Sequence, residues 1–275
     1  MSKVDSELLD FDDRITTDGG LVYSIVKNKT NKRFTVGFRG TAGFKDILTD
    51  GKFAFKQTPE LFKKTEFKPT IHRGFASYLF DNRKEVREDG TTVMRTRFDC
   101  IVASLKDSFE ELDEDDRKNY DVCVTGHSLG GALANLLACK IAEIERDCSF
   151  FDKVLAMTFA APVVGGQSYN EAFQALEKQG RLRYIRISNE NDLIPTQPYP
   201  FYTQNGVNLH VRKDKKMNYA YRNTKIVFSQ LGFSNPLIHH GLPEYENRLF
   251  GIPENKSILE KSIAELYIKA GDFTN

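Results

Sequence analysis

The sequence predicts an α/β fold with a mainly parallel sheet and helices on both of its faces. Short runs of β-branched and aromatic residues alternate along the chain with longer amphipathic stretches, as in sheets whose strands are joined by helices. The run over residues 154–160 is apolar apart from Thr158, which is typical of a strand buried on both sides. The chain has 275 residues, 40% of them hydrophobic, and contains no repeat and no evident linker. We therefore expect residues 1–275 to form one domain with a full core.

In the first half of the chain, residues 21–26 and 33–38 are predicted strands separated by a polar turn. A helix is expected to begin near Phe75, and the charged segment 83–97 is expected to be exposed. A longer helix is predicted over residues 98–112 because its apolar side chains fall on one stripe. They are Phe98, Ile101, Val102, Leu105, Phe109 and Leu112. The acidic run that follows, 113–116, could bind calcium, but more often such a run is simply solvated.

In the second half, the sequence predicts strands over residues 154–160 and 182–187, with a helix over residues 170–178 between them. Gly180 is the expected left-handed stop of that helix. A final helix is predicted over residues 255–270. Alternation of strands and helices is therefore expected to continue through most of the chain.

Composition argues against several classes of protein. The net charge is +1, which gives no overall attraction to nucleic acid or to an anionic membrane. The N-terminus lacks the apolar segment of a signal peptide, and no apolar run is long enough to span a bilayer. The four cysteines fit no metal-ligand spacing, so buried thiols are expected, with two disulfide bridges as the alternative. The cysteines are Cys100, Cys123, Cys139 and Cys148. These features favour an intracellular, reducing location.

The stretch with the most chemical content is Gly126-His-Ser-Leu-Gly130. It follows a β-branched run and precedes an apolar helical run, so it has the strand–turn–helix context of a nucleophile elbow. Such a turn strains the backbone of Ser128, and side chains at Gly126 or Gly130 would collide with the neighbouring strand or helix. The helix start also offers free N–H groups to an oxyanion. The alternative, a tight glycine turn with a surface serine, explains fewer of these features.

A serine hydroxyl needs an adjacent base, and the base needs an orienting group. The chain contains five histidines. In the usual order on such folds the acid and then the histidine follow the serine, which disfavours His72. His127 lies inside the elbow and is expected to point away from a productive geometry. This leaves three candidates, His210, His239 and His240.

Several acids lie downstream of Ser128, namely Asp147, Asp152, Asp192, Asp214 and Asp272. Asp192 is the candidate for the orienting acid, because it follows a predicted strand directly and Pro195 fixes the exit of its turn. An Asx-turn role is the alternative for Asp192. Glu190 is the reserve candidate, although a solvated loop charge explains it better.

The strand over residues 33–38 runs into the loop 39–43, at the strand end where α/β sheets bind ligands. This loop is therefore a candidate wall of the site. The segment 44–50 has helical apolar spacing and two interpretations, a mobile cover of the site or an ordinary surface helix.

Six blocks of the sequence together resemble the class 3 lipases, the fungal-lipase type of α/β-hydrolase. They occur in order and span residues 34–249. The blocks are Gly37-Phe-Arg-Gly-Thr41, Ile71-His-Arg-Gly-Phe75, Val124-Thr-Gly-His-Ser-Leu-Gly-Gly-Ala-Leu-Ala134, Thr158-Phe-Ala-Ala-Pro-Val-Val-Gly165, Asn191-Asp-Leu-Ile-Pro195 and His240-Gly-Leu-Pro-Glu-Tyr245.

The resemblance implies a catalytic triad of Ser128 as nucleophile, Asp192 as orienting acid and His240 as base. It selects His240 over His239 through the offsets to Leu242 and Tyr245; His239 is then a packing neighbour and His210 a surface residue. It also implies an oxyanion hole formed by the backbone N–H groups of Leu129 and Thr41, assisted by the Thr41 hydroxyl. The segment after Thr41 would be a lid that contacts a lipid surface. The substrate would be a lipid ester, most simply a tri- or diacylglycerol, and no metal or organic cofactor would be required.

Some features depart from the family pattern. The chain contains no tryptophan and has Asp46-Ile47 where the family often has Asp-Trp. Secreted members carry a signal peptide and disulfides, so the chain resembles the intracellular branch more closely. A phospholipase, a galactolipase or a thioesterase would use the same triad, and the basic residues Arg212, Lys213, Lys215 and Lys216 would suit an anionic head group. A non-catalytic lipid-sensing scaffold is the remaining alternative, although such modules usually lose part of the triad.

Overall fold

The computed structural model describes residues 5–13, 21–40, 55–57, 69–86, 89–144, 151, 153–196, 203–221, 239–259, 261 and 265–266. Its main element is an eight-stranded sheet with the order β1-β2-β3-β8-β9-β10-β11-β12. The strands are β1 Ser6–Asp12, β2 Tyr23–Asn28, β3 Arg33–Phe38, β8 Asp121–His127, β9 Val154–Phe159, β10 Leu182–Asn189, β11 Val207–Val211 and β12 Met217–Tyr221.

The centre of the sheet is parallel and both of its edges are antiparallel. Strands β3, β8, β9, β10 and β11 pair in parallel with one another. Strands β1, β2 and β3 pair antiparallel at one edge, and β12 pairs antiparallel with β11 at the other. The predicted mainly parallel sheet is therefore confirmed. The edge strands β1 and β12 were not predicted.

The helices are α2 Arg73–Phe80, α3 Arg97–Glu110, α4 Glu114–Arg117, α5 Leu129–Glu143, α6 Gln167–Lys178, α7 Leu242–Phe250 and α8 Pro253–Leu259, with the 3-10 turn η1 Ile194–Thr196. Gly180 ends α6 with φ +74°, as predicted. The segment before α3 contains the hairpin of β6 Arg83–Val86 and β7 Thr92–Arg95. The expectation that the segment 83–97 is exposed is wrong at Arg97, which is buried with its Nε 3.6 Å from the Asp12 carboxylate. Strand β4 Phe55–Gln57 pairs with β5 Thr70–His72. The acidic run begins with Asp113, which caps α4 by accepting a hydrogen bond from the Asp116 N–H.

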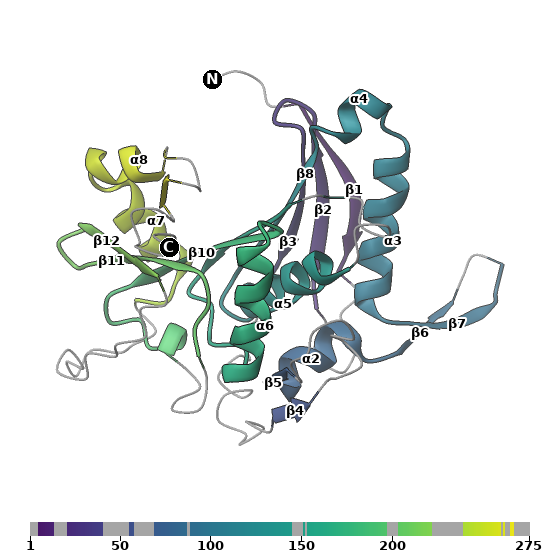
Figure 1. Cartoon of the computed structure of the whole chain (residues 1–275), viewed down its shortest axis with the longest axis horizontal. Coiled ribbons are helices and arrows are strands. Elements are labelled where there is room, and N and C mark those ends of the chain that lie inside the picture. Colours follow the sequence, from purple (N-terminus) through teal and green to yellow (C-terminus); the bar gives the residue numbers. More distant parts are fainter. Residues whose placement is uncertain are drawn as a thin grey trace.

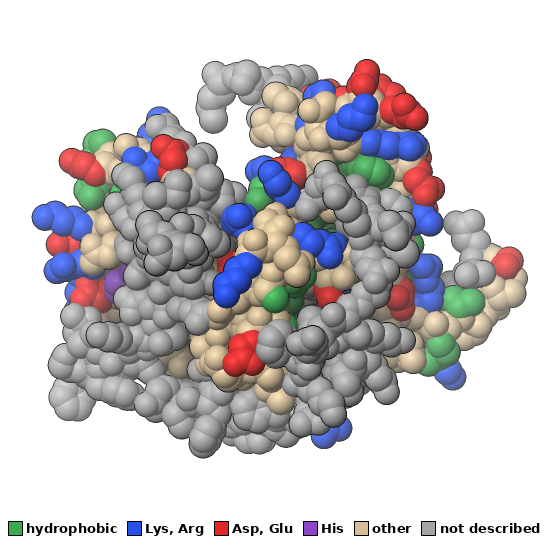
Figure 2. Space-filling model, in the orientation of Figure 1, with side chains coloured by type: hydrophobic (Ala, Val, Ile, Leu, Met, Phe, Trp, Pro, Cys, Tyr) green, Lys and Arg blue, Asp and Glu red, His purple; other side chains and the backbone are tan. Residues whose placement is uncertain are grey.

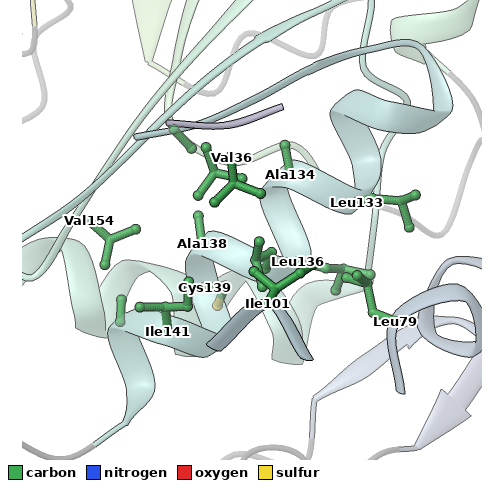
Figure 3. Close-up of a cluster of buried hydrophobic side chains, with 14 of the residues drawn as sticks. Val36, Leu79, Ile101, Leu133, Ala134, Leu136, Ala138, Cys139, Ile141 and Val154 are labelled. Carbon is green, nitrogen blue, oxygen red and sulfur yellow. The ribbon is translucent and has the colours of Figure 1, made fainter. Parts of the chain in front are cut away.

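Helix α5 lies at the centre of the core. Every one of its residues except Lys140 is buried, because the sheet covers one side and other helices cover the opposite side. Figure 3 shows Ala134 and Ala138 of α5 facing Val36 of the sheet, with Leu136 directed toward Ile101 of α3. The small side chains of α5 allow this close approach to the strands, so the start of the helix is held firmly against the sheet.

The second face of the sheet is covered at one end by α7 (Figure 1). Ile187 of β10 and Leu209 of β11 pack there against Tyr245 and Leu249 of α7. Helix α7 was not predicted, and the predicted final helix over residues 255–270 instead begins as α8 at Pro253. Helices thus lie on both faces, and α7 brings the C-terminal part of the chain to the strands that carry the site. Among the described helices, none combines the length and the apolar character that a membrane span requires.

Candidate active site

Ser128 lies in a strained turn between β8 and α5. Its backbone has φ 58° and ψ −125°, a conformation that costs a non-glycine residue of the order of 1–3 kcal/mol. The Ser128 N–H donates a hydrogen bond of 2.9 Å to the Phe159 carbonyl at the end of β9. The neighbouring strand therefore holds Ser128 in its strained conformation, and the predicted elbow geometry is confirmed.

Two glycines make the turn possible. A Cβ atom at Gly126 would lie 2.3 Å from the Gly130 carbonyl of α5. A Cβ atom at Gly130 would lie 2.4 Å from the Phe38 carbonyl of β3. Both distances are far below van der Waals contact, so the predicted collisions with helix and strand are confirmed.

Three side chains from distant parts of the chain meet at this turn. The Ser128 Oγ lies 2.8 Å from the Nε2 of His240. The Nδ1 of His240 lies 3.1 and 3.0 Å from the two carboxylate oxygens of Asp192. Because the carboxylate can only accept, the Nδ1 carries the proton and the Nε2 is free to accept the proton of Ser128. The structure thus brings together the three residues that the sequence proposed as a triad.

Asp192 is buried and has further hydrogen-bond donors besides His240. The Tyr245 hydroxyl donates to one carboxylate oxygen at 2.7 Å, and the Ile194 N–H donates to the other at 3.0 Å. The bond to Ile194 means that Asp192 also forms the Asx-type turn considered as its alternative role. Burial, followed by the charge of Asp192, raises the pKa of Tyr245 well above its ordinary value, so the phenol remains a donor. These donors hold the carboxylate of Asp192 in place beside His240.

His127 joins the elbow to the loop that carries His240. Its Nε2 lies 2.7 Å from the backbone carbonyl of His240, so it must donate there rather than act on Ser128. The two imidazole rings lie 4.7 Å apart. Burial lowers the pKa of His127, and the hydrogen bond to the His240 carbonyl offsets part of this effect. A neutral His127 therefore holds the main chain of the histidine loop.

The remaining histidines lie outside the triad. His210 is half-buried on β11, with its Nδ1 3.0 Å from the Ser188 hydroxyl, so the expectation of a surface residue is wrong. It was wrong because neither β11, which carries His210, nor β12, which pairs with it, was predicted. His72 stacks on Phe75 with ring centroids 4.2 Å apart, and burial lowers its pKa to about 4. His239 is the packing neighbour that was expected, and it contacts Arg248.

Glu190, the reserve acid, lies at the start of the same loop as Asp192. Its carboxylate accepts a hydrogen bond of 2.7 Å from the Lys213 N–H. Glu190 therefore ties the acid loop to the turn after β11, whereas Asp192 is the acid that contacts the base.

Only a part of the predicted oxyanion hole lies within the described residues. Leu129 is the first residue of α5, and the first N–H groups of a helix have no partner within it. Gly40 runs close to the elbow, because a Cβ atom there would lie 2.8 Å from the His127 carbonyl and 3.5 Å from the Ser128 Cβ. Thr41 and the predicted lid 44–50 lie outside the described residues.

Two residues that support the site, Tyr245 and Arg248, received no such role from the sequence. They are three positions apart, so they share one face of α7 and both are buried. That spacing would have been a signal for a helix with an inward polar face. Within the described part of the chain, no group of histidine, cysteine and acidic side chains is placed to hold a metal ion.

The sheet, the elbow and the Ser128–His240–Asp192 array define an α/β-hydrolase with a serine at the nucleophile position. A family model described as lipase (class 3) matches residues 35–202, more than half of the chain. The chain belongs to the class 3 lipase family.

Curated relatives include phospholipases and a lipase. The chain is 28% identical over 186 residues to phospholipase A1-Igamma2 of Arabidopsis thaliana, an alignment that covers 65% of the chain and 33% of that protein. It is 30% identical to phospholipase A1-II 2 of Oryza sativa, covering 63% of the chain and 43% of that protein. A segment of 85 residues, 30% of the chain and 16% of the other protein, is 39% identical to a triacylglycerol lipase of Ricinus communis. The chain thus spans less than half the length of these curated relatives.

Solved structures support the fold. Lipase II from Rhizopus niveus superposes with a TM-score of 0.63 at 19% identity, covering 86% of this chain and 79% of that one. A deletion mutant of the Rhizomucor miehei lipase propeptide complex gives a TM-score of 0.64 at 20% identity, covering 87% of this chain and 68% of that one. At this identity the likeness concerns the fold alone.

Proposed function

We propose that the protein hydrolyses carboxylic esters of lipids through an acyl-enzyme on Ser128. The observation that carries the proposal is the continuous hydrogen-bonded array from the Ser128 Oγ through both nitrogens of His240 to Asp192. A buried carboxylate that fixes the tautomer of a histidine is what the activation of a serine requires.

In the first half of the reaction, His240 Nε2 takes the Ser128 proton while the Oγ attacks the ester carbonyl. The oxyanion that forms would be stabilised by the Leu129 N–H and, as the family resemblance implies, by Thr41. Collapse of this intermediate expels the alcohol, which receives the proton from His240. In the second half, His240 takes a proton from water, the hydroxide attacks the acyl carbonyl, and Ser128 recovers its proton as the fatty acid leaves.

The proposed substrate is a neutral acylglycerol. The resemblance to class 3 lipases and the matched segment of the Ricinus communis triacylglycerol lipase support this choice. We also propose that the segment 44–50 covers the site and contacts the lipid surface. A rise in turnover when a soluble ester is taken above its aggregation point would support that contact, and proportional kinetics through that point would contradict it.

A phospholipid is the second candidate, and a basic turn favours it. Strand β11 is parallel to β10, with Val211 opposite Asn189. The turn after β11 therefore lies at the same C-terminal end of the strands as Asp192. The exposed residues Arg212, Lys213 and Lys216 belong to this turn. Figure 2 shows lysine and arginine side chains gathered at the end of the molecule formed by β11 and β12. Several relatives are named as phospholipases A1.

The first experiment tests the chemistry. Fluorophosphonate labelling and hydrolysis of p-nitrophenyl esters are measured on the wild type and Ser128→Ala. Ser188→Ala is the matched control, because Ser188 also contacts a histidine nitrogen, that of His210 at 3.0 Å. We expect Ser128→Ala to lose labelling and several orders of magnitude in turnover, and Ser188→Ala to retain both. Labelling that survives in Ser128→Ala would overturn the proposal.

The second experiment tests the substrate. Turnover is compared on triacylglycerol, diacylglycerol, phosphatidylcholine and phosphatidylglycerol, with wild type and the Lys213→Gln/Lys216→Gln variant. Faster turnover of acylglycerols, unchanged in the variant, is the expected result. Faster turnover of phosphatidylglycerol that the variant loses would favour the second candidate instead.

A further inference from the structure

Helix α7 carries a buried arginine directed at the two loops of the triad. Arg248 is 3% exposed and follows Tyr245, which contacts Asp192, by one helical turn. A charged side chain is rarely buried unless its donors are satisfied. The identity of those partners shows what the residue does.

The Arg248 guanidinium has three partners in three different segments. Its Nε donates to the Glu244 carboxylate at 2.6 Å, within α7. Its Nη1 donates to the Glu190 carbonyl at 3.0 Å, at the start of the acid loop. Its Nη2 lies 2.8 Å from the Nδ1 of His239, beside the base. Each guanidinium nitrogen therefore contacts a different segment: α7, the loop of the acid or the loop of the base.

The contact with His239 fixes the state of that ring. A guanidinium can only donate hydrogen bonds, so the Nδ1 of His239 must accept and its proton must be on Nε2. His239 is the residue before His240, and its carbonyl accepts a longer bond of 3.4 Å from the Asn189 amide. The main chain just before His240 is thus held by two contacts of His239, one from its ring to Arg248 and one from its carbonyl to Asn189.

The acid and the base come from loops 48 positions apart in the sequence. Glu190 lies two residues before Asp192, and His239 lies one residue before His240. We propose that Arg248 is a positioning residue of the triad, which sets the separation of the acid loop and the base loop with one rigid guanidinium. This inference rests on the proposed catalytic role of the triad.

A purely structural role is the competing explanation, since Arg248 and Glu244 form an ion pair at i,i+4 spacing. Such a pair within a helix does not require burial. It also does not require the two further contacts, which Arg248 makes with the acid loop and the base loop outside α7. A lysine could keep the charge and one contact but could not reach three acceptors in different directions. Arg248→Lys therefore separates charge from geometry.

The first test compares Arg248→Lys with Arg186→Lys. Arg186 is equally buried at 3%, donates to a backbone carbonyl, that of Asn205, and lies outside the triad loops. Because a small displacement of catalytic groups can cost about 10²-fold, we expect kcat of Arg248→Lys to fall roughly 10²-fold with KM changed by less than about twofold. Both variants should lower the melting temperature by a similar amount, and Arg186→Lys should retain kcat.

The second test uses a smaller change on the other side of the contact. His239→Leu removes the acceptor of Nη2, whereas His239→Asn can place an amide oxygen near the position of Nδ1. We expect His239→Leu to lower kcat and His239→Asn to restore most of it. The low-field proton resonance of the His240 Nδ1–H, bonded to Asp192, should broaden or shift in Arg248→Lys and His239→Leu and remain in His239→Asn.

The inference is overturned if Arg248→Lys retains kcat, or if its loss of kcat is matched by Arg186→Lys at equal loss of stability. If Arg248→Lys does not fold, the two His239 variants decide: equal kcat in both overturns the inference. Failure of the proposed function is distinct, because it appears as activity that survives in Ser128→Ala. The proton resonance requires no substrate and reports on the loops in either case.

Discussion

The serine and the histidine of the site are held in place in different ways. Ser128 is positioned by a contiguous segment, in which β8, a turn flanked by Gly126 and Gly130, and α5 follow one another. His240 is positioned by hydrogen bonds with Asp192 and His127, which are far away in the sequence, and, through His239, by Arg248 of α7. The nucleophile thus depends on local steric fit, and the base depends on long-range polar contacts.

This difference has a consequence for mutations. Steric fit in a close-packed turn fails abruptly, because backbone atoms have nowhere to move. A hydrogen-bonded loop loses its contacts one at a time, each of modest energy. Changes at the elbow should therefore affect folding above all, and changes around the histidine should affect turnover as well as folding. We expect the largest effect at the elbow and the smallest where the two regions join.

The elbow should not tolerate even one added methyl group. In Gly130→Ala the new Cβ would lie 2.4 Å from the Phe38 carbonyl, so we expect a loss of about 4 kcal/mol or more in the free energy of unfolding. Gly90→Ala is the control, since Gly90 has φ +79° and, among the described residues, no atom lies within 4 Å of a Cβ placed there. It should lose only about 1–2 kcal/mol. Urea denaturation measures both, and equal losses would contradict a steric origin for the elbow.

The base side should respond through the support of its acid. Tyr245→Phe removes a donor to Asp192 and leaves the Asn189 N–H without its 3.0 Å acceptor. We expect a loss of about 2 kcal/mol in stability and a fall of roughly 10-fold in kcat, equivalent to about 1.4 kcal/mol.

Tyr184→Phe is the control for this variant. Tyr184 is also fully buried, and its hydroxyl bonds to the Thr158 hydroxyl at 2.8 Å, away from the triad. Its loss should reduce stability and leave kcat unchanged. If Tyr245→Phe also retained kcat, Asp192 would not need this donor. Turnover would then not depend on each hydrogen bond that supports His240 and its acid.

The smallest effect concerns His127, which joins the two regions. Burial lowers its pKa below 6.5, so as the pH falls through 6.5 the unfolded chain takes up a proton that the folded protein does not. Stability that is fully present above this pH should therefore decline below it. In His127→Gln, whose amide can still donate to the His240 carbonyl, this decline should be shallower, by about 1 kcal/mol or less at pH 5.

Thermal unfolding between pH 5 and pH 8 checks this prediction. His210→Gln is the control, because burial also lowers the pKa of His210 while its ring contacts Ser188. Both variants should flatten the acid side of the stability profile, and only His127→Gln should also alter turnover. A profile unchanged in His127→Gln would show that the ring takes up its proton equally in the folded and unfolded chains.

The sequence by itself determined the parts of the protein that local patterns encode. These were the strand–elbow–helix unit, the apolar strand that became β9, the helix that became α3, and the glycine stop at Gly180. Each follows from side-chain periodicity or from steric limits on a few adjacent residues. Its place directly after a predicted strand and before Pro195 selected Asp192 as the acid, and the family resemblance chose His240 among three histidines.

Tertiary structure alone decided how the acid and the base meet. No apolar stripe in the sequence predicted α7, because its polar inward residues, Tyr245 and Arg248, interrupt the stripe that marks a buried helix. Their partners Asp192 and Glu190 become neighbours of these residues only when β10 and α7 pack together. Polar contacts between distant segments have no periodic signature in a sequence, since their geometry exists only after the core has brought the segments together.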